Sequence, residues 1–296
     1  SDRNCSRYSA SDRELHPIRI VRERVKPERD QQKGHHSTSV RRRNYWWQFD
    51  GVRADLYAAI SKMNRCLVTA RVTKHLCFSF QPTNRILNDK LYVFPFETLS
   101  PFGVLQSRIH APWTWLLSST MKTDLNYSAT DCFETFPFPQ RDPRAVIPRL
   151  EEIGRRLYDN RAAYMVATQQ GLTQTYNRLK DPDCHDHDLL ALRELHVELD
   201  RAVLAAYGWA DLIDLPGVPP YTTPKTDAEK RAFAAFEDAV IDRLFALNGE
   251  RAEEERLAGA TAAAPSGTKT RGAKPATKGR RPRPPTAQLA LEPQED

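Results

Sequence analysis

Residues 126–139 read "NYSATDCFETFPFP", and this stretch separates two parts of the chain that have different sequence patterns. It sets three phenylalanines and two prolines behind a short polar run. Pro137 and Pro139 exclude both a continuing helix and a central strand at this point, because proline lacks the amide hydrogen that either would use. We therefore predict a stiff apolar hinge that joins two structural units.

The residues before the hinge indicate a small unit of mixed strands and helices. Asp50 is a candidate cap for a helix with apolar residues at helical spacing. Ser100 and Pro101 open a second, amphipathic helix, in which Pro112 predicts a kink. Between these helices, three short runs are rich in β-branched and aromatic residues, as strands are: 66–72, 76–80 and 91–96.

The residues after the hinge indicate helices. From residue 143 onward, apolar residues recur at steps of three and four over a long helix, a short helix and a third that ends at Gly208, where a left-handed cap belongs. Thr226 and Glu229 form the capping box of a last helix. From Ala260 on, few residues can form a core, so we predict disorder.

These patterns predict an α+β fold class, in which a small mixed α/β domain is followed by a helical, bundle-like domain and a disordered basic tail. The tail would be the last of four segments. They are a charged N-terminal segment that is the remnant of a preceding domain (1–44), the mixed domain (45–139), the helical domain (140–257) and the tail (258–296).

Charge gives the first indication of a partner. The chain carries 44 Lys and Arg against 38 Asp and Glu, with a net charge of +6. Nine of these cations, with only three acids, lie between Ile18 and Arg43, which favours a polyanionic partner. The alternative is a solvated basic face and a solubilising tail.

The same composition bears on location. No apolar run approaches the roughly 18 residues of a membrane span. The polar N-terminal stretch shows no secretory signal, and the five scattered cysteines suit reduced thiols, so we expect a cytoplasmic protein and a chain that is a fragment or processed.

Several basic and aromatic residues are candidates for contacts with nucleic acid. Arg71, Lys74 and His75 stand between two apolar runs, where a tight strand–turn–strand would present them to phosphates or base edges. The alternative is a hairpin with a solvated basic turn. Arg108 is a candidate phosphate contact, whereas the adjacent Trp46 and Trp47 are expected to pack rather than to stack on bases.

Other motifs are read as structural. The sequence "DPDCHDHD" (181–188) has cysteine and histidines, but their spacing matches no common zinc site and the acids suit the first turn of a helix, so we predict no metal. His196 lies on an apolar helix face and is expected to be a core histidine. No glycine-rich nucleotide loop and no nucleophile signature is found, so the chain does not read as a complete enzyme.

Stretches spread over residues 20–256 carry a further signal. They include "YWWQFDGVRADLYAAI", "RCLVTARVTKHLCFSF", "NYSATDCFETFPFP", "GLTQTYNRLKD" and "LHVELDRAVLAAYGW". In this order they resemble the C-terminal half of large adenine-specific DNA methyltransferases of type II restriction–modification and related phage-defence systems.

The resemblance implies that residues 20–139 read a DNA sequence, with a target recognition domain at 45–139, and that the helices from 143 to 256 support it. Double-stranded DNA would be the partner. In the family, a catalytic domain uses S-adenosylmethionine to methylate the exocyclic amine of adenine. With the basic clusters, the candidate DNA-binding residues are Arg41, Arg42, Arg43, Arg71, Lys74, His75, Arg108 and Lys122.

The sequence departs from the family where chemistry is concerned. The cofactor loop and the Asn-Pro-Pro-Tyr catalytic loop do not appear, and in "VPPY" (218–221) Val218 offers no acceptor to an adenine amine. We therefore assign no catalytic or cofactor-binding residue and expect a truncated gene, or a separate methyltransferase polypeptide that binds S-adenosylmethionine. The alternatives are a non-enzymatic specificity subunit, and a structural module that does not read bases.

Overall fold

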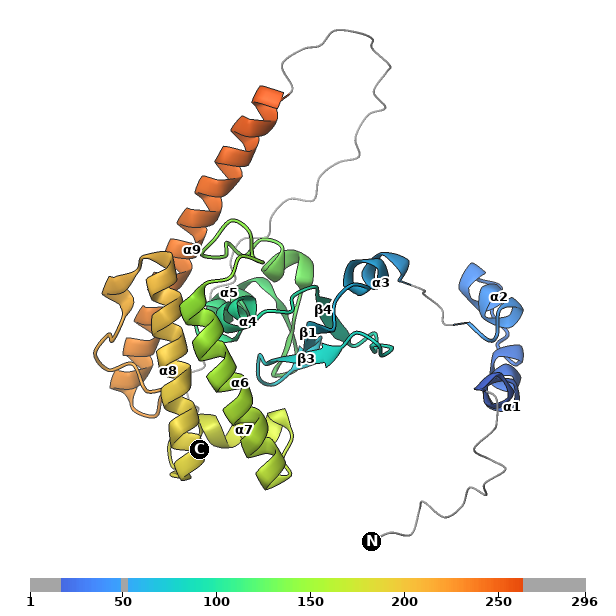
Figure 1. Cartoon of the computed structure of the whole chain (residues 1–296), viewed down its shortest axis with the longest axis horizontal. Coiled ribbons are helices and arrows are strands. Elements are labelled where there is room, and N and C mark those ends of the chain that lie inside the picture. Colours follow the sequence, from blue (N-terminus) through green and yellow to red (C-terminus); the bar gives the residue numbers. More distant parts are fainter. Residues whose placement is uncertain (1–16, 49–52, 263–296) are drawn as a thin grey trace, which may run out of the picture. The chain divides into compact units, whose positions relative to one another are not determined.

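The computed structural model describes residues 17–48 and 53–262 and confirms the predicted α+β fold class (Figure 1). The chain divides into two compact units, 1–250 and 251–296. Asp50, residues 1–16 and most of the predicted disordered tail lie outside the described residues. The N-terminal elements are α1 (Pro17–Asp30), α2 (Ser37–Asn44), α3 (Ala54–Ile60), β1 (Arg65–Ala70), β2 (Val72–Thr73), β3 (Phe78–Pro82) and β4 (Leu91–Phe94).

The first sheet contains the three predicted strands in the order β3-β1-β4, all antiparallel. The central strand β1 is buried on both faces. Leu67, paired with Phe80 and Phe94, faces the main core. Cys66 and Val68 face the other way, toward α3. Because successive side chains of a strand point to opposite faces of the sheet, β1 contributes both to the main core and to the smaller cluster beneath α3.

A second, smaller sheet was not predicted. Its order is β2-β6-β5, with β5 at Ser119–Met121 and β6 at Asp124–Asn126. The chain leaves the first sheet at Arg71, whose amide donates to the carbonyl of Lys90 at 2.8 Å and whose carbonyl accepts from the amide of Tyr127 at 2.8 Å. The predicted tight turn between 66–72 and 76–80 is therefore wrong: β1 and β3 do pair, but the chain between them contributes β2 to the second sheet.

The predicted helix with a kink at Pro112 is instead two helices, α4 (Leu99–Gln106) and α5 (His110–Leu117). Pro112 lies in the first turn of α5, where its missing amide hydrogen has no intrahelical partner to lose. The break falls at Ser107–Ile109, because the amide of Arg108 donates to Asp200 Oδ1 at 2.8 Å rather than to a helical carbonyl.

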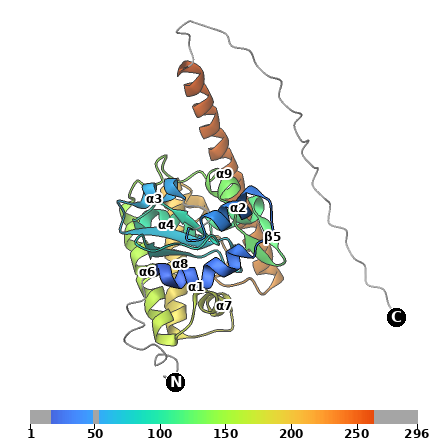
Figure 2. The same cartoon turned by 90° about the vertical axis from the view of Figure 1, so that its right-hand side faces the viewer.

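The C-terminal elements confirm the helical prediction. Gly208 ends its helix in the left-handed conformation (φ 77°), and Thr226 and Glu229 form the reciprocal capping box. Asp186 caps the N-terminus of the same helix that Gly208 ends. The helices are α6 (Pro148–Thr168), α7 (Leu172–Lys180), α8 (His187–Tyr207) and α9 (Asp227–Ala262), which is continuous past the predicted boundary at 257 (Figure 2).

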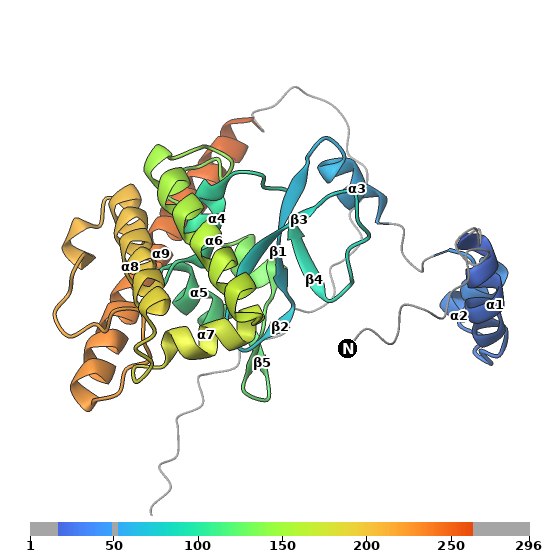
Figure 3. The same cartoon turned by 60° about the horizontal axis from the view of Figure 1, so that its bottom comes forward.

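Helices α4, α6 and α8 pack directly on one another (Figures 1 and 3). Gly154 of α6 permits the closest approach, since a Cβ atom there would lie 2.9 Å from the carbonyl oxygen of Leu99. Glu151 of α6 caps α4 from outside the helix, accepting from the amides of Leu99 at 2.7 Å and Ser100 at 2.8 Å. The helical segment therefore completes the start of α4.

The phenylalanine–proline stretch, predicted as a stiff apolar hinge, is a buried connection between the two parts. Phe136 and Phe138 are each 5% exposed, and the ring of Phe133 packs 4.5 Å from that of Phe94. Tyr207 of α8 donates its hydroxyl to the carbonyl of Pro137 at 2.8 Å. The two parts that this stretch joins consequently share one hydrophobic core, and their functional division remains a prediction.

Arg161 ties the parts together from within that core. Its side chain is buried, and its guanidinium donates to the carbonyl of Phe78 at 2.7 Å, to Gln106 Oε1 at 3.2 Å and to the hydroxyl of Tyr176 at 3.1 Å. These partners lie on β3, α4 and α7. One side chain of α6 thus fixes the sheet to the helices.

Candidate nucleic-acid interface

Two of the predicted cations meet at one end of the second sheet. Thr73 of β2 pairs with Leu125 of β6, so Lys74 follows beside Asp124, next to the turn that carries Lys122. Both lysines are exposed. Among the described residues neither ammonium group has a carboxylate partner within ion-pair distance. This end of the sheet therefore presents two unneutralised positive charges.

Strands β5 and β6 form a ribbon with a two-residue turn, Lys122 and Thr123 (Figure 3). All five residues from Ser119 to Thr123 are exposed. Lys122 has φ 58°, a left-handed conformation that costs a residue with a Cβ atom about 1–2 kcal/mol. Glycine would form the same turn without strain, so a charged side chain stands at this exposed tip at some cost in stability.

Arg71 lies at the opposite end of β2, three residues or about 10 Å from Lys74. It borders a surface hollow of about 340 Å³. Tyr92, Asn126, Ser128 and Asp131 are among the other residues around it. The hollow thus combines a guanidinium, an amide, hydroxyls and a carboxylate, which are the groups that form hydrogen bonds with base edges.

Sequence reasoning missed this hollow. Asn126 donates to Ser119 Oγ at 2.8 Å, and Ser128 donates to Asp131 Oδ2 at 2.6 Å, so its polar wall is ordered by its own hydrogen bonds. The signal that could have found it is the run of small polar residues at 126–131, just before the first phenylalanine of the phenylalanine–proline stretch.

His75 does not join the exposed cations. Its Nε2 donates to Asn177 Oδ1 of α7 at 2.9 Å, and its ring lies beside that of Tyr176. Burial lowers the pKa of His75, and the neighbouring Lys180 and Lys74 lower it further, while the hydrogen bond to Asn177 opposes them. The imidazole therefore anchors the turn after β2 to helix α7.

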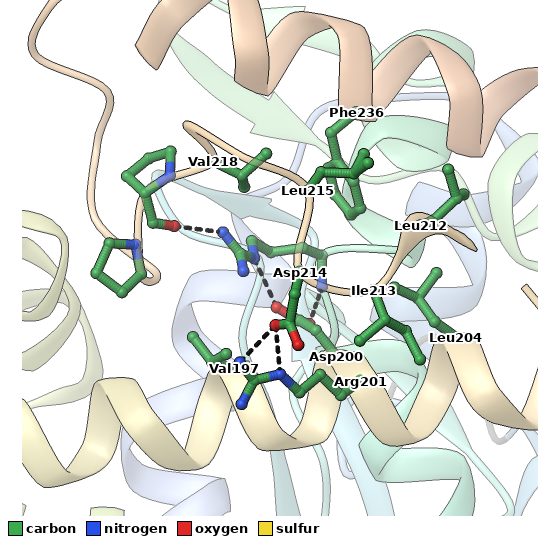
Figure 4. A pocket seen from close by; sticks show the side chains of 13 residues that line it. Val197, Asp200, Arg201, Leu204, Leu212, Ile213, Asp214, Leu215, Val218 and Phe236 are labelled. Carbon is green, nitrogen blue, oxygen red and sulfur yellow. Dashed lines mark hydrogen bonds and ion pairs between the residues drawn. The ribbon is translucent and has the colours of Figure 1, made fainter. Parts of the chain in front are cut away.

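Arg108 also has an internal role. Its Nε donates to Asp200 Oδ2 at 2.5 Å and its Nη1 donates to the carbonyl of Pro219 at 2.9 Å. The side chain of Asp200 is only 5% exposed and that of Arg108 15%. The pair borders a pocket of about 250 Å³ whose lining includes Leu204, Leu212, Leu215, Val218 and the Arg201–Asp214 ion pair (Figure 4). We do not include Arg108 in the interface.

The basic run at 41–43 lies on α2. Arg43 donates to the carbonyls of Gln32 and Gly34, and these hydrogen bonds hold α2 against the loop after α1. Arg41 is exposed and Arg42 is half-buried. Trp46 packs against α1, where the ammonium group of Lys26 lies 5.9 Å from its ring, in agreement with the prediction that this tryptophan packs within the protein. Trp47 is 47% exposed.

The "VPPY" segment and His196 are structural, as predicted. Tyr221 stacks on His196 with ring centroids 3.7 Å apart, and His196 Nε2 lies 3.2 Å from the hydroxyl of Tyr176. Burial lowers the pKa of His196 well below its usual range, and the cations Arg161, Lys180 and Arg108 add to that effect. A neutral, stacked imidazole in the core fits packing rather than proton transfer.

The described residues do not fit the methyl donor of the resembled family. Both sheets are antiparallel, and within 53–250 no glycine-rich turn leads from a strand into a helix to cradle a nucleotide. We derive no step through S-adenosylmethionine from this part of the chain.

Comparison with known proteins places the N-terminal part in a class. Residues 8–140 match the family model of the MmeI target recognition domain. The match covers β1 to β6 and the phenylalanine–proline stretch, so the resemblance predicted from the sequence is confirmed there.

Particular relatives agree with this class. DNA methyltransferase A of Bacillus subtilis (strain 168) is 32% identical over 124 residues, which are 41% of this chain and 12% of that protein. The structure of the type IIL restriction-modification enzyme MmeI in complex with DNA has the same fold over 84% of this chain, with 18% identity and a TM-score of 0.52. This chain spans 28% of that structure's chain, so each relative is much longer than the part matched.

Within residues 17–48 and 53–262, no helix is both long and apolar enough to cross a membrane. The longest, α9, carries charged residues throughout its length.

Proposed function

We propose that this chain is the DNA-recognition portion of a restriction–modification type, adenine-specific DNA methyltransferase, acting in the cytoplasm. The observation that carries the proposal is the β5–β6 hairpin, exposed from Ser119 to Thr123, with Lys122 at its tip and Lys74 beside it, inside the region that matches a target recognition domain. The major groove of B-DNA, where every base pair shows a distinct pattern of donors and acceptors, is wide enough to admit such a hairpin.

In this proposal the side chains divide into two roles. Lys74 and Lys122 contact phosphates and set the register of the protein on the duplex. Arg71, Asn126 and Asp131 around the hollow offer donors and acceptors to base edges, since Arg pairs with guanine, Asn with adenine and Asp with the amine of cytosine. The distance of about 10 Å between Arg71 and Lys74 corresponds to about three base-pair rises.

The methylation step would belong to a catalytic part that these residues do not form. That part, in the same or a separate polypeptide, would bind S-adenosylmethionine and receive the extruded adenine. Support comes from the relatives, whose names describe a DNA methyltransferase and a restriction-modification enzyme and whose lengths greatly exceed the matched region.

The salt dependence of duplex binding tests the phosphate contacts. Binding of the 296-residue chain to a labelled duplex is measured from 50 to 300 mM salt for the parent and for Lys74→Ala and Lys122→Ala. Each lysine that neutralises one phosphate should reduce the slope of log K against log salt by about 0.9. Lys230→Ala on α9, whose lysine pairs with Asp227, is the matched control and should leave the slope unchanged. Equal slopes for all four proteins would contradict the assignment of the two lysines.

A further inference from the structure

Helix α7 has an exposed face that its packing does not explain. Leu172, Thr175, Tyr176 and Leu179 turn inward, while Thr173, Gln174 and Asn177 are exposed on the opposite side. The helix sequence, "LTQTYNRLK", has two basic residues and no acidic one. A short surface helix with neutral amides and no acid is unusual for a merely solvated face, which commonly mixes both charges.

The amide oxygens of this face each accept a hydrogen bond from within the protein. Gln174 Oε1 accepts from the amide of Gly171 at 3.3 Å in the capping box, and Asn177 Oδ1 accepts from His75 Nε2 at 2.9 Å. Among the described residues neither NH₂ group has an acceptor, so both can donate to a ligand. The helix starts at Leu172, and its first-turn N–H groups, which point along the helix axis, have no intrahelical acceptor.

A hydrogen bond joins this face to the second sheet. Asn177 of α7 accepts from His75, which follows Lys74 in the turn after β2. Burial, Lys180 and Lys74 all lower the pKa of His75, but of the two lysines only Lys74 is exposed. The donors of α7 are thus linked through His75 to the turn that presents the Lys74 ammonium group.

We propose that this face of α7, through Thr173, Gln174 and Asn177, binds phosphate oxygens of the DNA backbone beside the segment held by the β5–β6 ribbon. Phosphate oxygens accept hydrogen bonds only, and protein contacts to them come from Thr, Asn and Gln side chains and helix N-termini as well as from Lys and Arg. The proposal rests on the proposed function and extends it: the helical part binds DNA itself in addition to bracing the recognition domain.

The test introduces charge without disturbing the fold. Gln174→Glu keeps an acceptor for the Gly171 amide and places an acid in the first helical turn, where it stabilises a helix. Gln140→Glu is the matched control, the same change at an exposed position near the other end of α6, a helix of 21 residues and therefore about 31 Å long. Thermal melting should show both variants folded like the parent.

Duplex binding by fluorescence anisotropy at low salt should then separate the variants. Gln174→Glu is expected to weaken binding about fivefold, the change that one like-charge contact at close range in water produces. Asn177→Asp should act in the same direction at pH 8, while Thr173→Lys should strengthen binding, a gain that damage to the fold cannot mimic. Gln140→Glu should bind like the parent.

The outcomes distinguish the two proposals. If the parent binds DNA and Gln174→Glu binds as tightly as Gln140→Glu, the phosphate contact by α7 is refuted and the DNA-recognition function stands. If the parent itself fails to bind any duplex, the proposed function fails and the contact with it. A gain with Thr173→Lys together with a loss with Gln174→Glu supports the contact.

Discussion

Arg108→Met tests whether Arg108 serves the fold or the DNA. In the structure the change would leave the carboxylate of Asp200 buried, with only the amide of Arg108 still donating to it. Removing one partner of a buried ion pair costs about 3–5 kcal/mol of unfolding free energy. Urea unfolding followed by tryptophan fluorescence measures this loss.

A second substitution should restore part of the stability. The double variant Arg108→Met with Asp200→Asn has no buried unpaired charge, and the side-chain oxygen of residue 200 still accepts from the backbone amide of residue 108. Its loss of unfolding free energy should therefore be only about 1–2 kcal/mol, mainly because the carbonyl of Pro219 loses its donor. If the double variant is as unstable as Arg108→Met or more so, the buried pair does not act as described.

The pH dependence has a defined sign. Burial already raises the pKa of Asp200 against the opposing effect of Arg108, and loss of Arg108 should raise it further. A carboxyl whose folded pKa lies above its unfolded value contributes stability that is present at low pH and lost as pH rises. The deficit of Arg108→Met should therefore be smaller at pH 5 than at pH 8. Its DNA-binding salt slope should equal that of the parent, and a slope lower by about 0.9 would show that Arg108 contacts a phosphate after all.

Three further predictions concern the core and the ribbon. Burial lowers the pKa of His110 to about 3, so the stability that its neutral form provides is lost as pH falls below the unfolded value near 6.5. His110→Gln should therefore flatten the slope of stability against pH between 6.5 and 5 by about 1 kcal/mol per unit, and an unchanged slope would contradict this. Gly154→Ala should lower the free energy of unfolding by about 1–3 kcal/mol, because the added Cβ atom would meet the backbone of Leu99. Gly249→Ala, where nothing lies within 4 Å, should instead stabilise α9 by about 0.5–1 kcal/mol. Thermal melts that rank the two variants in the opposite order would refute the close approach of Gly154 to Leu99. Lys122→Gly should leave the protein as stable as the parent or up to about 1 kcal/mol more stable while weakening duplex binding; a loss of stability would show that the turn is not strained.

The elements that the sequence predicts well are those whose signals are local. Gly208 and the Thr226–Glu229 box end and begin helices through bonds within a few residues, and both predictions are confirmed. The strands of the first sheet could be predicted because β-branched and aromatic residues gather in each of them.

The second sheet depends on contacts that no local window contains. β2 pairs with β6 across some fifty residues, and each strand has only two or three residues, too few for a pattern. The same holds for the site. Asp200 reaches Arg108 over 92 positions and Asn177 reaches His75 over 102, so two side chains predicted to contact DNA form hydrogen bonds inside the protein. Lys74 and Lys122 are exposed, and their contact with DNA stays a prediction.

Selection from a random-sequence duplex pool tests the central claim most directly. The purified chain is mixed with the pool at moderate salt, and the bound fraction is sequenced for the parent and for Lys74→Ala. The account predicts a short shared motif for the parent, and the same motif recovered more weakly for the variant, because a phosphate contact adds affinity without adding specificity. A bound fraction with the same composition as the input pool would contradict sequence-specific DNA recognition by this chain.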